Sequence, residues 1–302
     1  MEASERERRD CRQSKSTRHV HCRSGKDSPG WTKIKDDAIG FGVYRPTDEA
    51  SDQASRARRR ADYQARQAAQ HAKLAGTLNA DKRDLQYRKI SHHSGLARAD
   101  RQALLDRGLS NDQIDQLVAA GVVWTWQPGE SFVGVTAALP GVDSSGQLRY
   151  LGGSLTIGAR DLQGRIVGAQ VRGKGNYYWI SSANDRGYGP QLASGENPIG
   201  FYQFSESIDL DITEGFLKPA IASLMWGGAW MGAAGRLFHS SSEQVKHVIA
   251  AFPDGRLILN PDGGAVNDPN TVREYWRLNQ LVAAIGRTLN VRWWGQVTKA
   301  DG

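Results

Sequence analysis

The sequence predicts an α/β fold whose last third is built on a mostly parallel sheet of four strands. Three observations indicate this fold. Residues 207–294 alternate between strand-like and helix-like segments, residues 122–206 consist of short apolar pieces separated by Gly, Asp and Ser turns, and residues 97–121 show the periodicity of two short helices. Strands and helices that alternate at this spacing are typical of βαβ units, which place their strands in parallel.

The excess positive charge lies at the N-terminal end. Residues 1–90 hold 21 Lys or Arg against 13 Asp or Glu, whereas the rest of the chain holds 18 against 19. Residues 1–45 are polar and poorly patterned, so we expect a basic, partly disordered arm that ends in the strand-like piece IGFGVYR. Residues 46–84 are rich in Ala, Gln and Arg, which predicts an exposed, basic helical linker. A basic segment beside a neutral body indicates a nucleic-acid partner, and a solvated tail is the alternative.

Residues 85–206 are expected to form one subdomain that opens with a helical hairpin. The first helix, ADRQALLDR, ends at Gly108, and the second begins with Ser110 and Gln113 at the spacing of a capping box and ends at Gly121. The second helix carries no Lys or Arg that could face phosphate. We therefore favour simple helix packing over a helix-turn-helix that reads DNA.

The β-rich remainder of this subdomain contains a predicted hairpin at Gln163-Gly164, between ARDL and RIVGAQVR. Basic side chains gather around this hairpin. We expect them to contact nucleic acid, and they are Arg160, Arg165, Arg172 and Lys174.

Residues 207–302 supply the predicted parallel sheet. Its strands are expected at DLDIT, AWMGAA, RLILN and VRWW. The helices between them are predicted from Phe216 to Met225, after the Ser240–Ser242 run, and from Asp268, which caps a helix with Pro269 at its first position.

Two acidic residues stand where strands of this sheet end. Glu214 closes the first strand and Asp262 closes the third, and each precedes a glycine. Ligands of such sheets bind at the carboxyl ends of the strands, where Lys218 can face the same cleft. Mg²⁺ is usually held by one or two carboxylates together with substrate phosphates, and a carboxylate can also move a proton. Either acid alone is more simply interpreted as a helix cap. Both acids occur in the same arrangement of strand, acid, glycine and helix, and the pair therefore favours a functional site.

Several segments resemble a known family. ITEGFLKPAIASL resembles the first Toprim motif, and LILNPDGGA resembles the second, where the family usually has Asp-x-Asp. Five further segments occur in the order found in Toprim-bearing replication proteins of cyanobacterial plasmids and phages: ARDLQGRIVGAQVR, YYWISSA, GENPIGFY, PDGGAVNDPNTVREY and VRWWGQVTKADG. The resemblance covers roughly residues 85–302.

The resemblance implies a primase-like enzyme that carries out Mg²⁺-dependent nucleotidyl transfer on single-stranded DNA. Glu214 is then the general acid or base and, with Asp262, a Mg²⁺ ligand, while Lys218 contacts phosphate. Nucleotides are the implied substrates, and a helicase domain or protein is an implied partner. One usual ligand is missing, because the second acid of Asp-x-Asp falls on Gly264. A non-catalytic nucleic-acid-binding module and a Toprim nuclease therefore stay as alternatives, and template preference and oligomeric state are not predicted.

The cysteines and the ends of the chain complete the expectations. Two cysteines and no long apolar run indicate a cytoplasmic protein without a signal peptide or membrane span. RDCRQSKSTRHVHCRSG resembles the latter half of a zinc ribbon, yet zinc is not expected here, because two closely spaced ligand pairs are lacking. The four candidate ligands are Cys11, His19, His21 and Cys22. Both ends of the chain predict a fragment of a longer protein.

Overall fold

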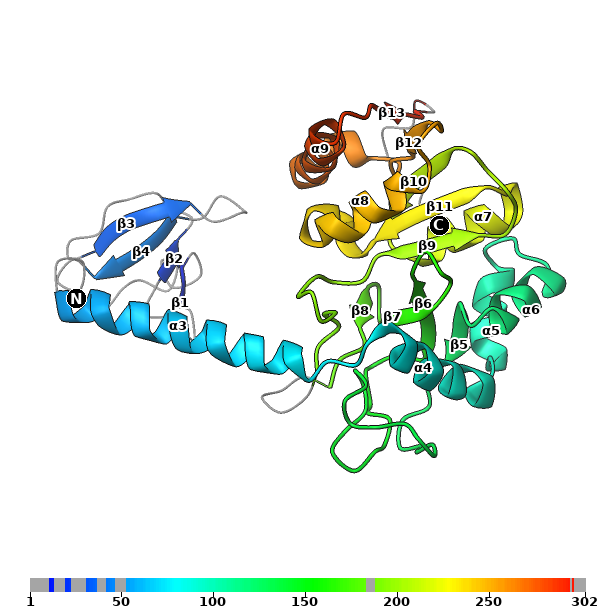
Figure 1. The fold of residues 1–302 in the computed structure, drawn as a ribbon, viewed down its shortest axis with the longest axis horizontal. Helices are drawn as coiled ribbons and strands as arrows, with labels where there is room; N and C mark the ends of the chain where they lie inside the picture. The colour runs from blue at the N-terminus through cyan, green and yellow to red at the C-terminus, as the bar shows by residue number, and fades with distance from the viewer. Residues whose placement is uncertain are drawn as a thin grey trace. The chain divides into compact units, whose positions relative to one another are not determined.

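The computed structural model describes residues 11–13, 20–22, 31–36, 42–46, 53–182, 188–293 and 295. The chain divides into two compact units, Met1–His71 and Ala72–Gly302, whose elements are labelled in Figure 1. The side chains of the four candidate zinc ligands lie outside the described residues, so zinc binding stays untested: Cys11, His19, His21 and Cys22.

The N-terminal unit contains a four-stranded antiparallel sheet in the order β1-β2-β4-β3. Its strands are β1 (Cys11–Gln13), β2 (Val20–Cys22), β3 (Trp31–Asp36) and β4 (Gly42–Pro46). Only the last of these strands was expected, and the first three were not predicted from the sequence. Among the described side chains of β2 to β4, only Val43 and Tyr44 are buried hydrophobics. Short antiparallel strands can pair through the backbone without a long apolar pattern, so these strands carry little signal in the sequence.

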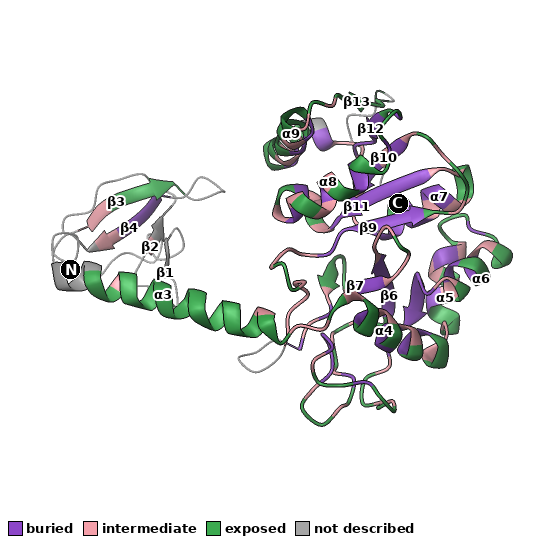
Figure 2. Cartoon of the chain, in the orientation of Figure 1, coloured by how far each residue is buried: buried purple, intermediate pink, exposed green. Residues whose placement is uncertain are grey.

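Helix α3 (Gln53–Ala75) confirms the predicted exposed helix. Nearly every described residue along it is exposed, as the green ribbon in Figure 2 shows. The next helix, α4 (Ala80–Ser94), was not anticipated, and the boundary placed between residues 84 and 85 falls inside it.

The helical hairpin is confirmed as α5 (Arg98–Leu105) and α6 (Asn111–Ala119). Ser110 and Gln113 form the predicted capping box, in which each side chain bonds the backbone N–H of the other residue. Leu104, Ile114 and Leu117 are fully buried, so the hairpin serves packing.

A four-stranded antiparallel sheet follows, in the order β5-β6-β7-β8. Its strands are β5 (Val123–Thr125), β6 (Leu155–Arg160), β7 (Ile166–Arg172) and β8 (Tyr177–Trp179). The predicted hairpin joins β6 and β7, with Gly164 at φ 75°. Helix α4 packs against this sheet through Tyr87 and Ile90.

The last sheet has five strands in the order β13-β12-β10-β11-β9. Four of them are parallel, namely β10 (Leu210–Glu214), β11 (Ala229–Ala233), β12 (Leu257–Leu259) and β13 (Leu289–Val291). The expected four-stranded sheet is corrected by β9 (Gly200–Gln203), which lies before residue 207 and pairs antiparallel with β11. The sheet is therefore mixed. This short strand also covers the edge that β11 would otherwise leave unpaired.

Helices cover both faces of the five-stranded sheet. On one face, α8 (Ser242–Ala250) and α9 (Pro269–Ala284) share a core with the strands, and on the other face α7 (Leu217–Trp226) joins the core of the helical hairpin and β5–β6. Two successive residues of β9 show this division, since Phe201 belongs to the first core and Tyr202 to the second. The Tyr202 hydroxyl also donates to the Gly158 carbonyl at 2.7 Å. The two sheets of this unit are thus held together beside α7.

Asp268 caps α9 as predicted, accepting a hydrogen bond from the Asn270 backbone N–H, and Pro269 begins the helix. Three short 3₁₀ turns complete the unit: η1 (Ala234–Arg236), η2 (Phe238–Ser241) and η3 (Ala265–Asn267). In the part of the chain that the structure describes, no helix combines the length and apolar character needed to cross a membrane.

Candidate active site

The structure brings the two predicted acids together. Glu214 ends β10, and Asp262 follows β12, its parallel neighbour in the sheet. The Lys218 ammonium lies 2.6 Å from Glu214 Oε1 and also pairs with Asp262 Oδ2. The side chains of Glu214 and Asp262 are only 17% and 16% exposed. A lysine that bridges two largely buried carboxylates defines the candidate site.

Gly215 gives this site its shape. Its φ of +71° lies in the left-handed region, which glycine adopts at no steric cost. The chain therefore turns directly from β10 into α7 after Glu214. Lys218, four residues after Glu214 in the first turn of α7, can then reach back to the strand end.

Arg236 belongs to the site and was missed by the sequence analysis. Its Nη1 lies 2.6 Å from Glu214 Oε2. It ends η1, which follows β11, the other parallel neighbour of β10. Its φ of 63° is the sole positive value at a non-glycine among the described residues, and such a conformation costs roughly 1–2 kcal/mol. The sequence GAAGRLF carries no motif, so only the position after β11 could have indicated this residue.

The two carboxyl groups differ in their protonation. Burial favours a higher pKa for Glu214, but hydrogen bonding with Asp262 and the charges of Lys218 and Arg236 outweigh it and lower the pKa to about 2. Burial raises the pKa of Asp262 to about 6, and the neighbouring Glu214 acts in the same direction against Lys218. Glu214 therefore stays ionised, whereas Asp262 can exchange a proton near neutral pH. Carboxyl pairs whose pKa values are pushed apart in this way are suited to acid–base work.

A third group faces the carboxylates from α9. The Tyr275 hydroxyl is buried beside the backbone of Asp262, and its own O–H has no acceptor among the described residues. Burial, and then the charges of Glu214 and Asp262, raise the pKa of this phenol. It is therefore a neutral donor at physiological pH that is available to a ligand.

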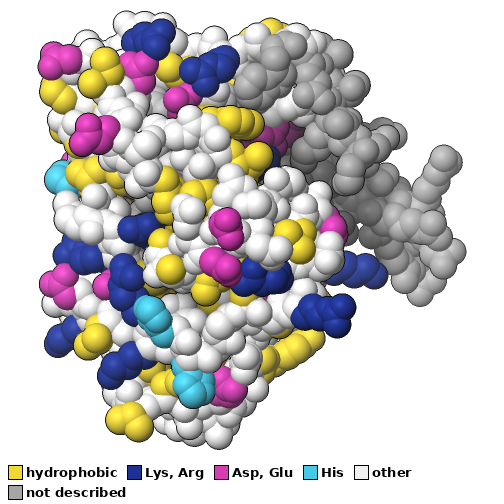
Figure 3. All heavy atoms as spheres, turned by 90° about the vertical axis from the view of Figure 1, so that its right-hand side faces the viewer, with side chains coloured by type: hydrophobic (Ala, Val, Ile, Leu, Met, Phe, Trp, Pro, Cys, Tyr) yellow, Lys and Arg dark blue, Asp and Glu magenta, His cyan; other side chains and the backbone are white. Residues whose placement is uncertain are grey.

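The site opens into a small cavity of about 100 Å³. Its walls include Glu214 and Lys218 together with Arg107 from the α5–α6 turn, Gln170 from β7 and Tyr177 from β8. Glu214 thus shares this cavity with the antiparallel sheet and the helical hairpin. Across the face drawn in Figure 3, Lys and Arg are interspersed with acidic and apolar side chains and do not form one basic patch.

The four basic residues expected around the β6–β7 hairpin fall into two groups. Arg165 pairs with Asp161 and Asp81 at 2.7 and 2.8 Å. Arg160 donates to the Gly164 carbonyl at 3.1 Å, and burial lowers its pKa. Both stabilise the hairpin.

Arg172 and Lys174 are exposed at the other end of β7. Arg172 pairs in register with Tyr177, which lines the cavity beside the acids. These two cations are therefore closer to the site along the sheet than Arg160 and Arg165, and they are the better placed to meet phosphate.

The residues present offer a limited metal site. No group of three or more His, Cys, Asp or Glu side chains with metal-binding geometry occurs among the described residues. Glu214 and Asp262 present two carboxylates, and one of them suffices for a Mg²⁺ that is also held by substrate phosphates. The Lys218 ammonium pairs with both carboxylates, and it is 46% exposed, so it can withdraw. Gly264, at φ 78°, adds no ligand.

Comparison with known proteins gives a likeness to solved structures alone. No protein-family model and no curated protein matches this chain. A solved structure described as the structure of the DnaG catalytic core is similar over 72% of this chain and 71% of that one, with 17% sequence identity and a TM-score of 0.46. We draw nothing about function from a likeness at this level.

Proposed function

We propose that the chain is a primase-like nucleotidyltransferase of plasmid or phage DNA replication, acting in the cytoplasm on single-stranded DNA in concert with a helicase. One observation carries this proposal. Glu214 and Asp262 meet at the carboxyl ends of neighbouring parallel strands, where Lys218 and Arg236 add positive charge for phosphates. The resemblance of the segments around Glu214 and Asp262 to Toprim motifs supports it.

The different pKa values suit the two acids to different roles. Mg²⁺, when bound, supplies positive charge to the triphosphate. Glu214, which stays ionised, is suited to hold that cation, and Asp262 is suited to take the proton from the attacking 3′-hydroxyl. The hydroxyl oxygen forms the new bond to the α-phosphorus, and pyrophosphate leaves with the electron pair of the broken bond. Lys218 and Arg236 hold phosphate oxygens. This assignment reverses the roles implied by the resemblance.

A second candidate is a non-catalytic module that binds nucleic acid. Two observations favour it, namely the glycine at position 264 and the lysine that already pairs with both carboxylates. Primer synthesis on single-stranded DNA across a Mg²⁺ titration separates the candidates. Gly264→Asp is the informative variant, because aspartate tolerates left-handed φ better than most residues and restores a carboxylate. If parent and variant are inert but bind DNA, the binding module is correct.

The pH dependence tests the role of Asp262. A general base works only when deprotonated, so the rate should fall as the pH is lowered through about 6, where Asp262 takes up a proton. Glu214, with a pKa of about 2, should contribute no further loss above pH 4. The measurement is the single-turnover rate between pH 5 and 8 at saturating Mg²⁺. A rate that is flat across this range would exclude Asp262 as the base.

The basic helix α3 should bind the phosphate backbone. Three of its exposed arginines, Arg58, Arg60 and Arg66, are changed together to Gln in the full chain. Each lost phosphate contact should lower the slope of log affinity against log salt by about 0.7 for single strands, or about 2 in all. Between 50 and 200 mM salt, the parent should then lose roughly 20-fold more of its affinity than the variant.

The control replaces three cations elsewhere by Gln. Lys82 and Arg98 are exposed, and the side chain of Lys246 is 38% exposed. If both triple variants keep the salt slope of the parent, α3 is only a solvated helix.

A further inference from the structure

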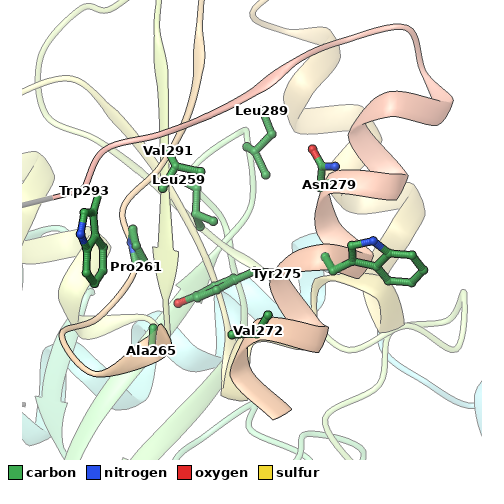
Figure 4. Close-up of a pocket in the computed structure, with 10 residues that line it drawn as sticks. Leu259, Pro261, Ala265, Val272, Tyr275, Asn279, Leu289, Val291 and Trp293 are labelled. Atoms are coloured by element: carbon green, nitrogen blue, oxygen red, sulfur yellow. The ribbon is translucent and has the colours of Figure 1, made fainter. Parts of the chain in front are cut away.

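A second hollow of the C-terminal unit lies apart from the cavity at Glu214 and Lys218. A groove of about 470 Å³ lies between α9 and the strands β12 and β13. In Figure 4, Tyr275 lies between Trp293 and Pro261 on one side and Asn279 and Leu289 on the other. This size is within the range of pockets that bury a small organic ligand.

Aromatic side chains dominate this groove. Tyr275 and Trp276 come from α9 and Trp293 follows β13. Trp276 is 55% exposed and Trp293 is 40% exposed, although large apolar side chains of this kind are usually buried in a core. The groove contains one side-chain amide, that of Asn279, among otherwise apolar or aromatic neighbours. Flat, accessible rings with a single amide suit a planar heterocycle that also has hydrogen-bonding edges.

The groove lies close to the acidic site along the chain. Pro261 and Ala265, which line the groove, stand on either side of Asp262 in the sequence. Tyr275 presents its ring to the groove, and its buried O–H has no acceptor among the described residues. A ligand that reached from the groove to the carboxylates would pass this hydroxyl. It would need a flat apolar end and a charged end that Lys218 and Arg236 can hold.

We propose that this groove binds a nucleobase by stacking on Trp276 and Trp293. The inference rests on the proposed function in taking nucleic acid or nucleotide as the ligand. The phosphate of the same or the next nucleotide then points toward the Lys218–Arg236 end. The base can come from a DNA strand or from an incoming nucleoside triphosphate, since both present the same ring and phosphate.

The test is direct binding, measured apart from synthesis. The probes are a twelve-residue oligothymidylate, followed by fluorescence anisotropy, and ATP, followed by calorimetry, each with the full chain. Trp276→Leu removes the ring but keeps an apolar side chain, and Trp276→Phe keeps a ring. Trp293→Leu is the second groove variant. The matched control is Trp226→Leu, since Trp226 is 75% exposed at the end of α7, outside the groove.

Stacking of a base on an aromatic ring is worth about 5- to 150-fold in affinity. Trp276→Leu and Trp293→Leu should each show a loss in this range, while Trp276→Phe keeps most of the affinity and Trp226→Leu keeps all of it. The salt slope should not change, because no phosphate contact is lost. A loss with the oligonucleotide alone assigns the groove to the strand, and a loss with ATP alone assigns it to the incoming nucleotide.

Unchanged affinities for both probes would overturn the inference, as expected if the groove instead receives an apolar peptide of a partner protein. A parent chain that binds neither probe would overturn it as well. The outcome is separate from that of the proposed function. If the parent makes primer and Trp276→Leu binds both probes as well as the parent, the groove proposal is rejected and the enzyme proposal stands. If the parent makes no primer and Trp276→Leu binds more weakly, the enzyme proposal is rejected and the groove proposal stands.

Discussion

Glu214→Gln should abolish Mg²⁺-dependent nucleotidyl transfer, with a loss of at least about 10²-fold in the single-turnover rate. Gln has nearly the same shape but no charge, so it cannot hold a cation or pair with Lys218 and Arg236, which both contact Glu214 at 2.6 Å. The fold should persist, because these cations are partly exposed and can be solvated.

The same variant should also change the titration of Asp262. Glu214 contributes to the raised pKa of Asp262, so its removal should shift that pKa toward the ordinary value. Carboxyl NMR titration of the Glu214→Gln protein measures the shift directly. This readout does not depend on activity and therefore tests the electrostatic coupling even if the chain is a binding module.

Glu206→Gln is the matched control, since Glu206 is an exposed glutamate in the loop before β10. It should leave both the rate and the Asp262 titration unchanged. If Glu214→Gln is as active as Glu206→Gln, the carboxylate cluster is not the catalytic centre.

The elements that the sequence predicted well are those specified by local signals. The capping box at Ser110 and Gln113 and the Asp268-Pro269 helix start satisfy backbone N–H groups within a few residues, so they need no knowledge of the fold. The closeness of Glu214 and Asp262 followed from one topological rule, since neighbouring parallel strands end at the same edge.

The missed elements depend on distant contacts. The N-terminal sheet and β9 consist of strands of three to six residues whose pairing partners lie elsewhere in the chain. Arg236 joins the site only because β11 lies beside β10. Its neighbours in the sequence carry no signal, so the pairing of the strands has to be known first.

Helix α4 was missed for a different reason. Its buried residues include Arg83, Gln86 and Ser91 as well as Tyr87 and Ile90, so its inner face shows no apolar stripe. The polar members are tolerated because they have specific partners. Gln86, for example, accepts a hydrogen bond from the Thr136 backbone N–H at 2.9 Å.

Arg83 is the residue of α4 on which stability should depend most. It is fully buried, and its guanidinium donates to the carbonyls of Leu78, Val167, Pro190 and Gln191. These bonds join the start of α4 to β7 and to the segment that precedes β9. Burial lowers the pKa of this arginine, which shows that its charge is held at some cost.

Arg83→Met should therefore lower the free energy of unfolding by about 3–5 kcal/mol. Met keeps much of the aliphatic volume, so the loss reports the carbonyls that are left without this donor, one of them buried and three partly buried. Urea denaturation followed by circular dichroism measures it. Lys82→Met is the control, because Lys82 is the exposed neighbour of Arg83 on the same helix, and it should change the unfolding free energy by no more than about 0.5 kcal/mol. Equal stability of the two variants would mean that the four carbonyls find other donors and that Arg83 does not fix α4 to the sheet.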